Sequence, residues 1–121
     1  MVLSLWQQRR WPEVERELDR IVARLRTLDP ERVILFGSFA RGDFHEGSDI
    51  DLIVILNTSE RFIDRIGHVL EVLDPADFDV EPLVYTAAEY ENMRQRRTTL
   101  IDAVEREGKV LYERSPGQQS L

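Results

Sequence analysis

Two apolar runs separated by only ten residues constrain the fold of this chain most strongly. The first run, RVILFG, covers residues 32–37, and the second, SDIDLIVIL, covers residues 48–56. Both are short, rich in Val, Ile and Leu, and bounded by turn-forming residues, which is typical of buried strands. Between them, SFARGD (38–43) predicts one or two helical turns and FHEG (44–47) predicts a loop. The runs therefore predict two strands joined by a short helical segment.

Longer amphipathic helices are expected on both sides of these strands. Apolar residues at steps of three and four predict a first helix from about Pro12 to Leu28, which ends before Pro30. The same spacing predicts a second helix that ends before Pro75. The apolar positions of the two helices are Val14, Leu18, Ile21, Leu25 and Leu28, and then Phe62, Ile66, Val69 and Leu73.

A third strand is predicted over DVEPLVYT, residues 79–86. Pro82 within this run cannot donate a hydrogen bond to a neighbouring strand, so the strand should lie at an edge or carry a bulge. TAAE (86–89) then forms a good capping box, which predicts the start of a helix that continues to about Gln95.

A last helix and a last strand complete the pattern. The helix is expected to start at Thr98 or Thr99 and to stop at Gly108, and KVLYE (109–113) predicts the strand. Strands thus alternate with helices, which predicts an α/β fold with helices packed on a small sheet. The sequence does not give the order of the strands.

Composition limits the classes of protein that remain. The length of 121 residues predicts a single domain over 1–114, followed by a polar, disordered tail over 115–121. No apolar run is long enough for a signal peptide or a membrane span, so a cytoplasmic protein without a membrane partner is expected. The net charge of −7 argues against general nucleic-acid binding but does not exclude nucleotides.

Two aspartates interrupt the second apolar run. Asp49 and Asp51 are two residues apart, so their side chains should leave the same face of the strand, opposite Ile50 and Leu52. Two adjacent like charges are costly unless a cation lies between them. Carboxylate oxygens are hard ligands of the kind that Mg²⁺ prefers. The aspartates therefore predict a magnesium site.

Gly37 and Ser38 end the first strand and begin the helical turn. A glycine there lets backbone N–H groups approach an anion closely, and Ser38 can add its hydroxyl group. A phosphate at this turn and a metal ion at the aspartates would together form a site for a nucleoside triphosphate.

The combined pattern resembles that of a known family. Gly37-Ser38, ten further residues and Asp49-Ile50-Asp51 resemble the G-S-x10-D-x-D signature of the DNA polymerase β-like nucleotidyltransferase superfamily. GSFARGD and GSDIDLIV are similar in particular to the minimal nucleotidyltransferases of prokaryotes, and the resemblance covers roughly residues 30–113. It implies a mixed sheet flanked by helices, ATP or another NTP as the donor, and two Mg²⁺ ions.

The resemblance also implies roles for single residues. Asp49 and Asp51 would be catalytic metal ligands, and Gly37 and Ser38 would contact the triphosphate. Arg41 lies one turn after Ser38 and could pair with a phosphate.

For Arg41 the sequence leaves a second interpretation open, which is a salt bridge to Asp43 or Glu46.

The family usually has a third carboxylate on a neighbouring strand, which completes the metal site and can act as a base. Asp79 and Glu81 are the two candidates, and both point to one face of the third strand. Glu81 is preferred because it lies better inside the strand. A glutamate there departs from the usual aspartate of the family.

Two functions follow from this resemblance. The first is a nucleotidyltransferase that moves an NMP, with AMP from ATP expected, to a hydroxyl group. Its acceptor would be a tyrosine of a small helical HEPN-type protein encoded nearby, in a toxin–antitoxin pair. The alternative is a catalytically weak module of the same fold that binds a helical partner or a nucleotide without turnover. Whether the chain also forms a homo-oligomer stays open.

Overall fold

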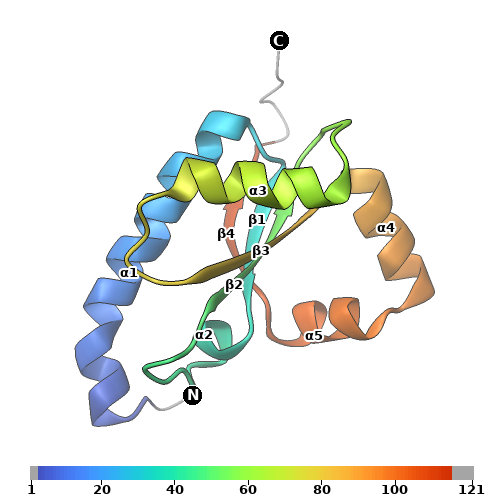
Figure 1. The fold of residues 1–121 in the computed structure, drawn as a ribbon. Helices are drawn as coiled ribbons and strands as arrows, with labels where there is room; N and C mark the ends of the chain where they lie inside the picture. The colour runs from blue at the N-terminus through green and yellow to red at the C-terminus, as the bar shows by residue number, and fades with distance from the viewer. Residues whose placement is uncertain (1–2, 116–121) are drawn as a thin grey trace.

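The computed structural model describes residues 3–115 as a sheet with helices around it (Figure 1). Residues 116–121 carry most of the predicted disordered tail and lie outside the described residues. The elements in chain order are α1 (Leu5–Leu25), a 3₁₀ turn (Arg26–Leu28), β1 (Arg32–Phe36), α2 (Ser38–Arg41), β2 (Ile50–Ile55), α3 (Phe62–Leu73), β3 (Val80–Tyr85), α4 (Ala87–Arg96), α5 (Thr99–Glu107) and β4 (Lys109–Glu113).

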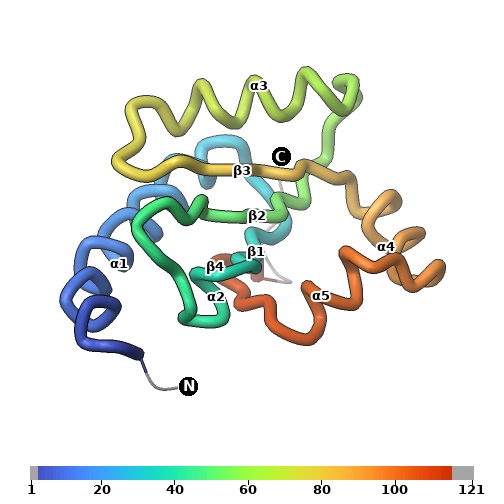
Figure 2. Tube along the Cα trace, turned by 60° about the horizontal axis from the view of Figure 1, so that its bottom comes forward, coloured from blue at the N-terminus to red at the C-terminus, as the bar shows by residue number. Residues whose placement is uncertain are grey.

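The four strands form one mixed sheet in the order β3-β2-β1-β4. Strand β1 is antiparallel to both β2 and β4, whereas β2 is parallel to β3. Figure 2 shows the strands side by side in this order. The prediction of a small mixed sheet flanked by helices is confirmed, and β3 lies at an edge, as Pro82 predicts.

Helices cover both faces of the sheet. Side chains of α1 and α3 pack with Val33, Leu52 and Val54 in one core, whereas α4 and α5 pack against Ile34 and Ile53 in a second, smaller core. Figure 2 shows α1 on one side of the strands and α4 and α5 on the other. The central strands are therefore buried on both faces, which explains why their sequences read as continuous apolar runs.

Strand β2 carries one candidate site residue inside this sandwich. Ile50 and Leu52 point into the core beneath α1 and α3, as the alternation predicts. On the opposite face, Asp51 is followed by Ile53 and Ile55, which are buried against α4 and α5. Asp51 thus lies at the end of a buried face, where the apolar cover stops.

The first helix begins earlier than its apolar spacing predicts. It starts at Leu5 rather than near Pro12, because Ser4 and Gln7 form a capping box. The Gln7 backbone N–H donates to Ser4 Oγ (3.2 Å), and the Ser4 N–H donates to Gln7 Oε1 (2.8 Å). Pro12 lies inside the helix and does not begin it.

The early turns of α1 support the loop that precedes β2. The Phe44 ring stacks on Phe39 with centroids 4.7 Å apart and also contacts Trp11 at 6.0 Å. Gln7 Nε2 donates a hydrogen bond to the Phe44 carbonyl oxygen (3.0 Å). These contacts fix the loop that leads to Asp49.

Within residues 3–115, no helix is both long enough and apolar enough to cross a membrane.

Candidate active site

Three predicted site segments meet at one end of the sheet. Because β1 runs antiparallel to β2, and β2 parallel to β3, the end of β1 lies beside the starts of β2 and β3. Asp51 pairs with Phe36 on one side and with Glu81 on the other. Asp49 immediately precedes β2. The strand order, which the sequence does not give, thus brings the two halves of the motif together with the third carboxylate.

The closeness of the three carboxylates affects the protonation of two of them, Glu81 and Asp51. Hydrogen bonding to Asp49 and its negative charge raise the pKa of Glu81, and burial and the charge of Asp51 add to the effect. Burial raises the pKa of Asp51, and the charge of Asp49 adds to it, although Glu81 and Arg41 act in the opposite direction. The site therefore concentrates negative charge, which a bound cation would relieve.

The two candidates for the third carboxylate lie in different surroundings. Glu81 is within hydrogen-bonding reach of both Asp49 and Asp51. Asp79 accepts a hydrogen bond from the Ile50 N–H through its backbone carbonyl (2.8 Å) and lines a cavity of about 300 Å³ near Leu70. The geometry groups Glu81, rather than Asp79, with the aspartate pair.

Gly37 is required by the close approach of Asp51. Its backbone has φ of 77°, a conformation that favours glycine. A Cβ atom at position 37 would lie only 2.2 Å from Asp51 Oδ2. The glycine thus makes room for a carboxylate, which is a second role beside the approach to phosphate that its position in the turn predicts.

Ser38 and Arg41 stand at the two ends of the single-turn helix α2. Across residues 3–115, the Ser38 hydroxyl group has no hydrogen-bond partner, so it is free to contact a ligand. Arg41 donates from Nε to Asp43 (3.1 Å) and from Nη1 to Glu107 (3.0 Å). The predicted salt bridge to Asp43 is therefore present, whereas the structure pairs Arg41 with Glu107 in place of Glu46. Its positive charge still reaches Asp51.

The carboxylates suit magnesium by their chemistry rather than by their present arrangement. In the part of the chain that the structure describes, no group of three or more His, Cys, Asp or Glu side chains is arranged to hold a metal ion. Glu81 nevertheless lies close enough to Asp49 and Asp51 for its pKa to rise in their presence. An all-oxygen, anionic donor set matches the preference of Mg²⁺, so these three residues would hold the ion.

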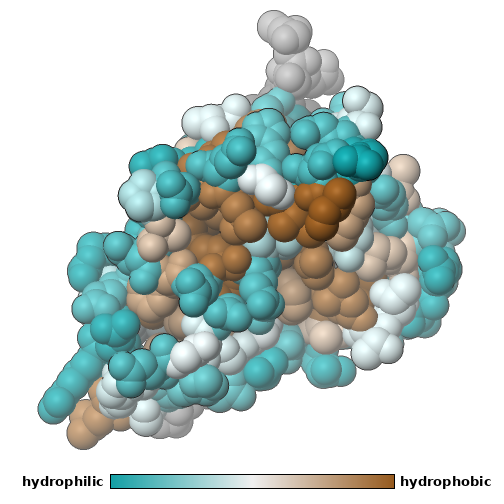
Figure 3. All heavy atoms as spheres, in the orientation of Figure 1, coloured by the Kyte–Doolittle hydropathy of each residue, from teal (hydrophilic) through white to brown (hydrophobic). Residues whose placement is uncertain are grey.

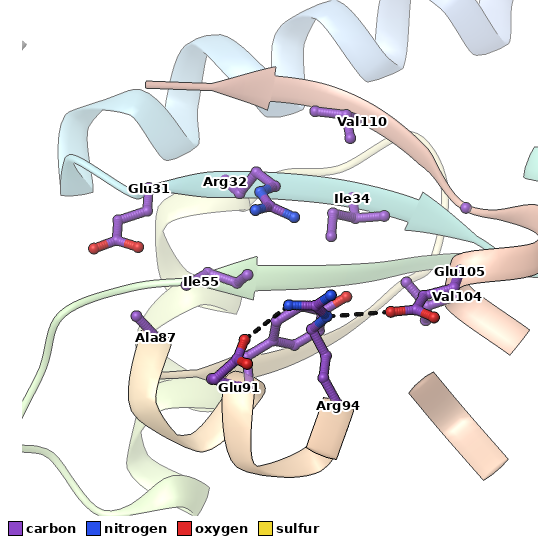
Figure 4. Close-up of a pocket in the computed structure, with 12 residues that line it drawn as sticks. Glu31, Arg32, Ile34, Ile55, Ala87, Glu91, Arg94, Val104, Glu105 and Val110 are labelled. Carbon is purple, nitrogen blue, oxygen red and sulfur yellow. Dashed lines mark hydrogen bonds and ion pairs between the residues drawn. The ribbon is translucent and has the colours of Figure 1, made fainter. Parts of the chain in front are cut away.

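A cavity of about 480 Å³ lies away from the carboxylates, between α4, α5 and the far end of β1 (Figure 4). Its floor contains Ile34 and Ile55. Arg94 projects into it but is paired with Glu91 (2.8 Å) and Glu105 (3.2 Å), as the dashed lines of Figure 4 show. Arg32, the other arginine of its lining, lies 4.0 Å from Glu113, and the acidic residues Glu31, Glu91 and Glu105 line the cavity as well, so it is a poor site for a triphosphate.

Two residues that support the site escaped the sequence prediction. Glu107 lies 66 residues from Arg41, and no local pattern links them. Glu17 is buried with 3% exposure, and its carboxylate accepts hydrogen bonds from the backbone N–H groups of Asp77 (2.7 Å) and Phe78 (3.1 Å). A signal for Glu17 did exist, because it stands three residues after Val14 on the apolar face of α1.

Known proteins are similar to this chain in sequence. The family described as nucleotidyltransferase domain matches residues 16–111. A Methanocaldococcus jannaschii protein, whose name describes an inferred protein adenylyltransferase, is 26% identical over 100 residues. The matched region covers 79% of this chain and 93% of that protein.

Solved structures share the fold. A structure described as a toxin–antitoxin with AMP-PNP matches with a TM-score of 0.55 and 25% identity, over 80% of this chain and 73% of that chain. A Sulfolobus solfataricus structure, described as an inferred nucleotidyltransferase, matches with a TM-score of 0.54 and 21% identity, over 95% and 90% of the two chains. These matches confirm the predicted polymerase β-like fold.

Proposed function

This chain belongs to the nucleotidyltransferase domain family, and on this premise we propose that it transfers AMP from ATP to a hydroxyl group of a partner protein. The observation that carries the proposal is the meeting of Asp49, Asp51 and Glu81 beside Gly37. The name of the M. jannaschii relative supports a protein as the acceptor. The AMP-PNP of the toxin–antitoxin relative supports an adenine nucleotide as the donor.

Gly37, Ser38 and Arg41 would hold the triphosphate. The free Ser38 hydroxyl can donate to a phosphate oxygen. Arg41 uses Nε and Nη1 for Asp43 and Glu107, which leaves Nη2 available for a phosphate and fixes the direction of the guanidinium group.

Asp49, Asp51 and Glu81 would hold two Mg²⁺ ions. When bound, the ions would activate the acceptor hydroxyl and stabilise the negative charge that develops during phosphoryl transfer. The carboxylates would place these ions at the end of the sheet, beside the turn that would hold the phosphates.

The transfer itself would be a single displacement. The acceptor oxygen forms a bond to the α-phosphorus, the bond from that phosphorus to the β-phosphate oxygen breaks, and pyrophosphate leaves. The acceptor proton would pass to the Glu81 carboxylate, which the register of β2 and β3 places opposite Asp51. No covalent enzyme intermediate is needed.

The partner would be a small helical HEPN-type toxin encoded nearby, modified on a tyrosine in the cytoplasm. The description of one solved relative as a toxin–antitoxin supports a two-protein system. A homo-oligomer of this chain within such an assembly is compatible with the proposal.

Intact mass spectrometry tests the reaction directly. The chain is mixed with the protein encoded beside it, ATP and Mg²⁺, and each modified hydroxyl of that neighbour should gain about 329 Da, the mass of one AMP added by transfer from ATP. Asp51→Asn should abolish the gain.

The alternative function is a module that binds a helical partner or a nucleotide without turnover. This alternative replaces the proposed enzymatic function if the neighbouring protein binds tightly to the chain but does not change in mass with any of the four NTPs.

A further inference from the structure

An apolar groove opens between α3 and α4 on the same face of the sheet as the candidate active site. It has a volume of about 420 Å³ and is lined by Phe62, Tyr85 and Met93, among others. The Phe62 and Tyr85 rings contact each other with centroids 5.4 Å apart. Figure 3 shows apolar atoms gathered over α3 and below it towards α4.

The exposed face of α3 extends this apolar surface. Phe62, Ile63 and Leu70 keep 40%, 67% and 41% of their surface exposed, although each is large and apolar. Large exposed apolar patches often mark sites where a protein binds a partner, whereas single exposed apolar residues are common on any surface.

The groove shares strand β3 with Glu81, because Tyr85 lines the groove and stands four residues after Glu81. Glu81, Leu83 and Tyr85 alternate along β3, so they share one face of the sheet. Leu83 and Tyr85 pack against the core beneath α4. The four residue steps from Glu81 to Tyr85 span about 13 Å. A segment seated in the groove would therefore reach the site where the acceptor hydroxyl must stand.

The free charge at the groove is positive. Glu89 lines the groove, but its carboxylate is paired with Arg65 (2.6 Å). Arg96 also lines it and, like the adjacent Arg97, is exposed without an ion-pair partner in residues 3–115. An occupant with acidic residues next to an apolar stripe would complement this end of the groove.

The backbone of β3 disfavours a strand as the occupant. The carbonyl groups of Asp79 and Tyr85 bond to β2, so residues 80, 82 and 84 direct their backbone groups to the open edge. Pro82 has no N–H group, and the Val84 carbonyl already accepts a hydrogen bond from Arg65 Nη1 (3.3 Å). An added strand would find few partners, whereas a helix needs only the apolar groove.

We propose that this groove docks an amphipathic helix of the partner protein, with an apolar stripe flanked by acidic residues, and that the same partner presents the acceptor hydroxyl. The proposal rests on the adenylyl-transfer function proposed above. Since a helix rises 1.5 Å per residue, the distance of about 13 Å corresponds to about nine residues of helix. The modified residue should thus lie about two to three turns from the anchored apolar residues.

Binding measurements with two surface variants test the groove. Phe62→Ser removes an apolar anchor, and Arg96→Glu reverses the free charge without touching the core. Each should weaken binding of the neighbouring protein by about tenfold or more, as is typical when an interface anchor is lost. Val110→Ser and Arg106→Glu are matched controls at exposed positions outside the groove and should leave affinity within about twofold.

Three results would overturn the proposal: equal affinity of parent, Phe62→Ser and Arg96→Glu; equal loss in the controls; or no binding of the neighbour by the parent. ATP affinity should be the same in all variants. If the parent binds the neighbour but never changes its mass, the proposed reaction is refuted. The comparison of affinities between parent and variants would still show whether the groove is the docking site.

Photo-crosslinking tests the geometry. Replacing Phe62 with p-benzoylphenylalanine should link the groove to a helical segment of the neighbour about two to three turns from its adenylylated residue. Crosslinks confined to a segment that cannot reach the modified residue would contradict the shared docking and acceptor role.

Discussion

The Glu17 carboxylate on α1 accepts a hydrogen bond from the Asp77 backbone N–H, 60 residues later in the chain (2.7 Å). The same carboxylate binds the Phe78 N–H and receives Arg20 Nε at 2.6 Å. Arg20 in turn donates to the Leu73 carbonyl oxygen (3.1 Å). This ion pair, with its carboxylate buried and its guanidinium partly exposed, thus ties the first helix to the segment that leads into β3 and to Glu81.

Glu17 should make stability depend on pH. Burial alone would raise its pKa, but hydrogen bonds from Arg20, Phe78 and Asp77 outweigh burial and lower the pKa below its ordinary value of 4.5. The folded state therefore holds the proton less tightly than the unfolded state. The ionised Glu17 carboxylate therefore contributes fully to the free energy of unfolding above pH 4.5. This contribution is lost as the pH falls through the lowered pKa of the folded state.

Urea unfolding of Glu17→Gln across this pH range measures the effect. The variant should lose about 1–3 kcal/mol near neutral pH, because a buried charged acceptor is removed, and the difference from the parent should shrink in acid. Glu13→Gln is the matched control, since the ion pair of Glu13 with Arg10 is exposed to solvent and its loss should change stability by about 0.5 kcal/mol or less. A loss that is independent of pH would contradict the charged hydrogen bonds.

Gly37→Ala should damage both stability and activity. The new Cβ atom would meet Asp51 Oδ2 at 2.2 Å, and φ of 77° would strain any side chain. We expect a lower melting temperature, and a smaller loss when Asp51→Ala removes the contact in the same chain, so the two changes should be coupled in a double-mutant cycle.

Gly67→Ala is the control for this glycine. Its Cβ atom would meet nothing within 4 Å on α3, so the change should stabilise the chain by about 0.5–1 kcal/mol. Purely additive effects of Gly37→Ala and Asp51→Ala would show that the close contact is not what requires the glycine.

The local parts of this molecule are predictable from sequence because the signals are local. The apolar runs predict β1 and β2, and the TAAE capping box predicts the start of α4, where Thr86 Oγ1 accepts from the Glu89 N–H (3.2 Å). The prediction of where α1 starts is wrong because Pro12 is a conspicuous first-turn residue, whereas the apolar spacing that marks the helix begins only at Val14, ten residues after the true cap at Ser4.

The long-range parts are not predictable in this way. The meeting of Asp51 with Glu81 depends on the order and register of strands that lie far apart in the chain. The pairing of Arg41 with Glu107 depends on where α5 ends after the sheet is formed. Alternation limits the third carboxylate to Asp79 and Glu81, and position within the strand favours Glu81, but that Glu81 lies opposite Asp51 follows only from the register of β2 and β3.

The aspartate pair should be a stability cost in the absence of metal. Asp49 raises the pKa of Glu81, and its charge also acts on Asp51, so the three carboxylates repel one another. We expect Asp49→Asn/Asp51→Asn to melt no lower than the parent in excess EDTA, and to lose the increase in melting temperature that Mg²⁺ with ATP gives the parent. A drop of several degrees in EDTA would mean that internal hydrogen bonds make the pair structural.

The identity of the third carboxylate gives the most discriminating prediction. Glu81→Gln should abolish adenylylation of the neighbouring protein, because Glu81 pairs with Asp51 in the sheet and reaches both aspartates. Asp79→Asn should retain most of the activity, since the tie of residue 79 to β2 is made by its backbone carbonyl, which the change leaves intact. The initial rate of mass gain, read by intact mass spectrometry at saturating ATP and Mg²⁺, compares the two variants.

Glu81→Asp separates a ligand from a residue that merely supports the strand. It keeps the charge and shortens the reach by one methylene group, so it should restore part of the activity that Glu81→Gln lacks, with a stronger dependence on Mg²⁺ concentration. A supporting role would instead give similar melting temperatures and similar, Mg²⁺-independent losses in both Glu81 variants. If Asp79→Asn is inactive while Glu81→Gln remains active, then the register between β2 and β3 does not decide the ligand, and Asp79 takes the role assigned to Glu81.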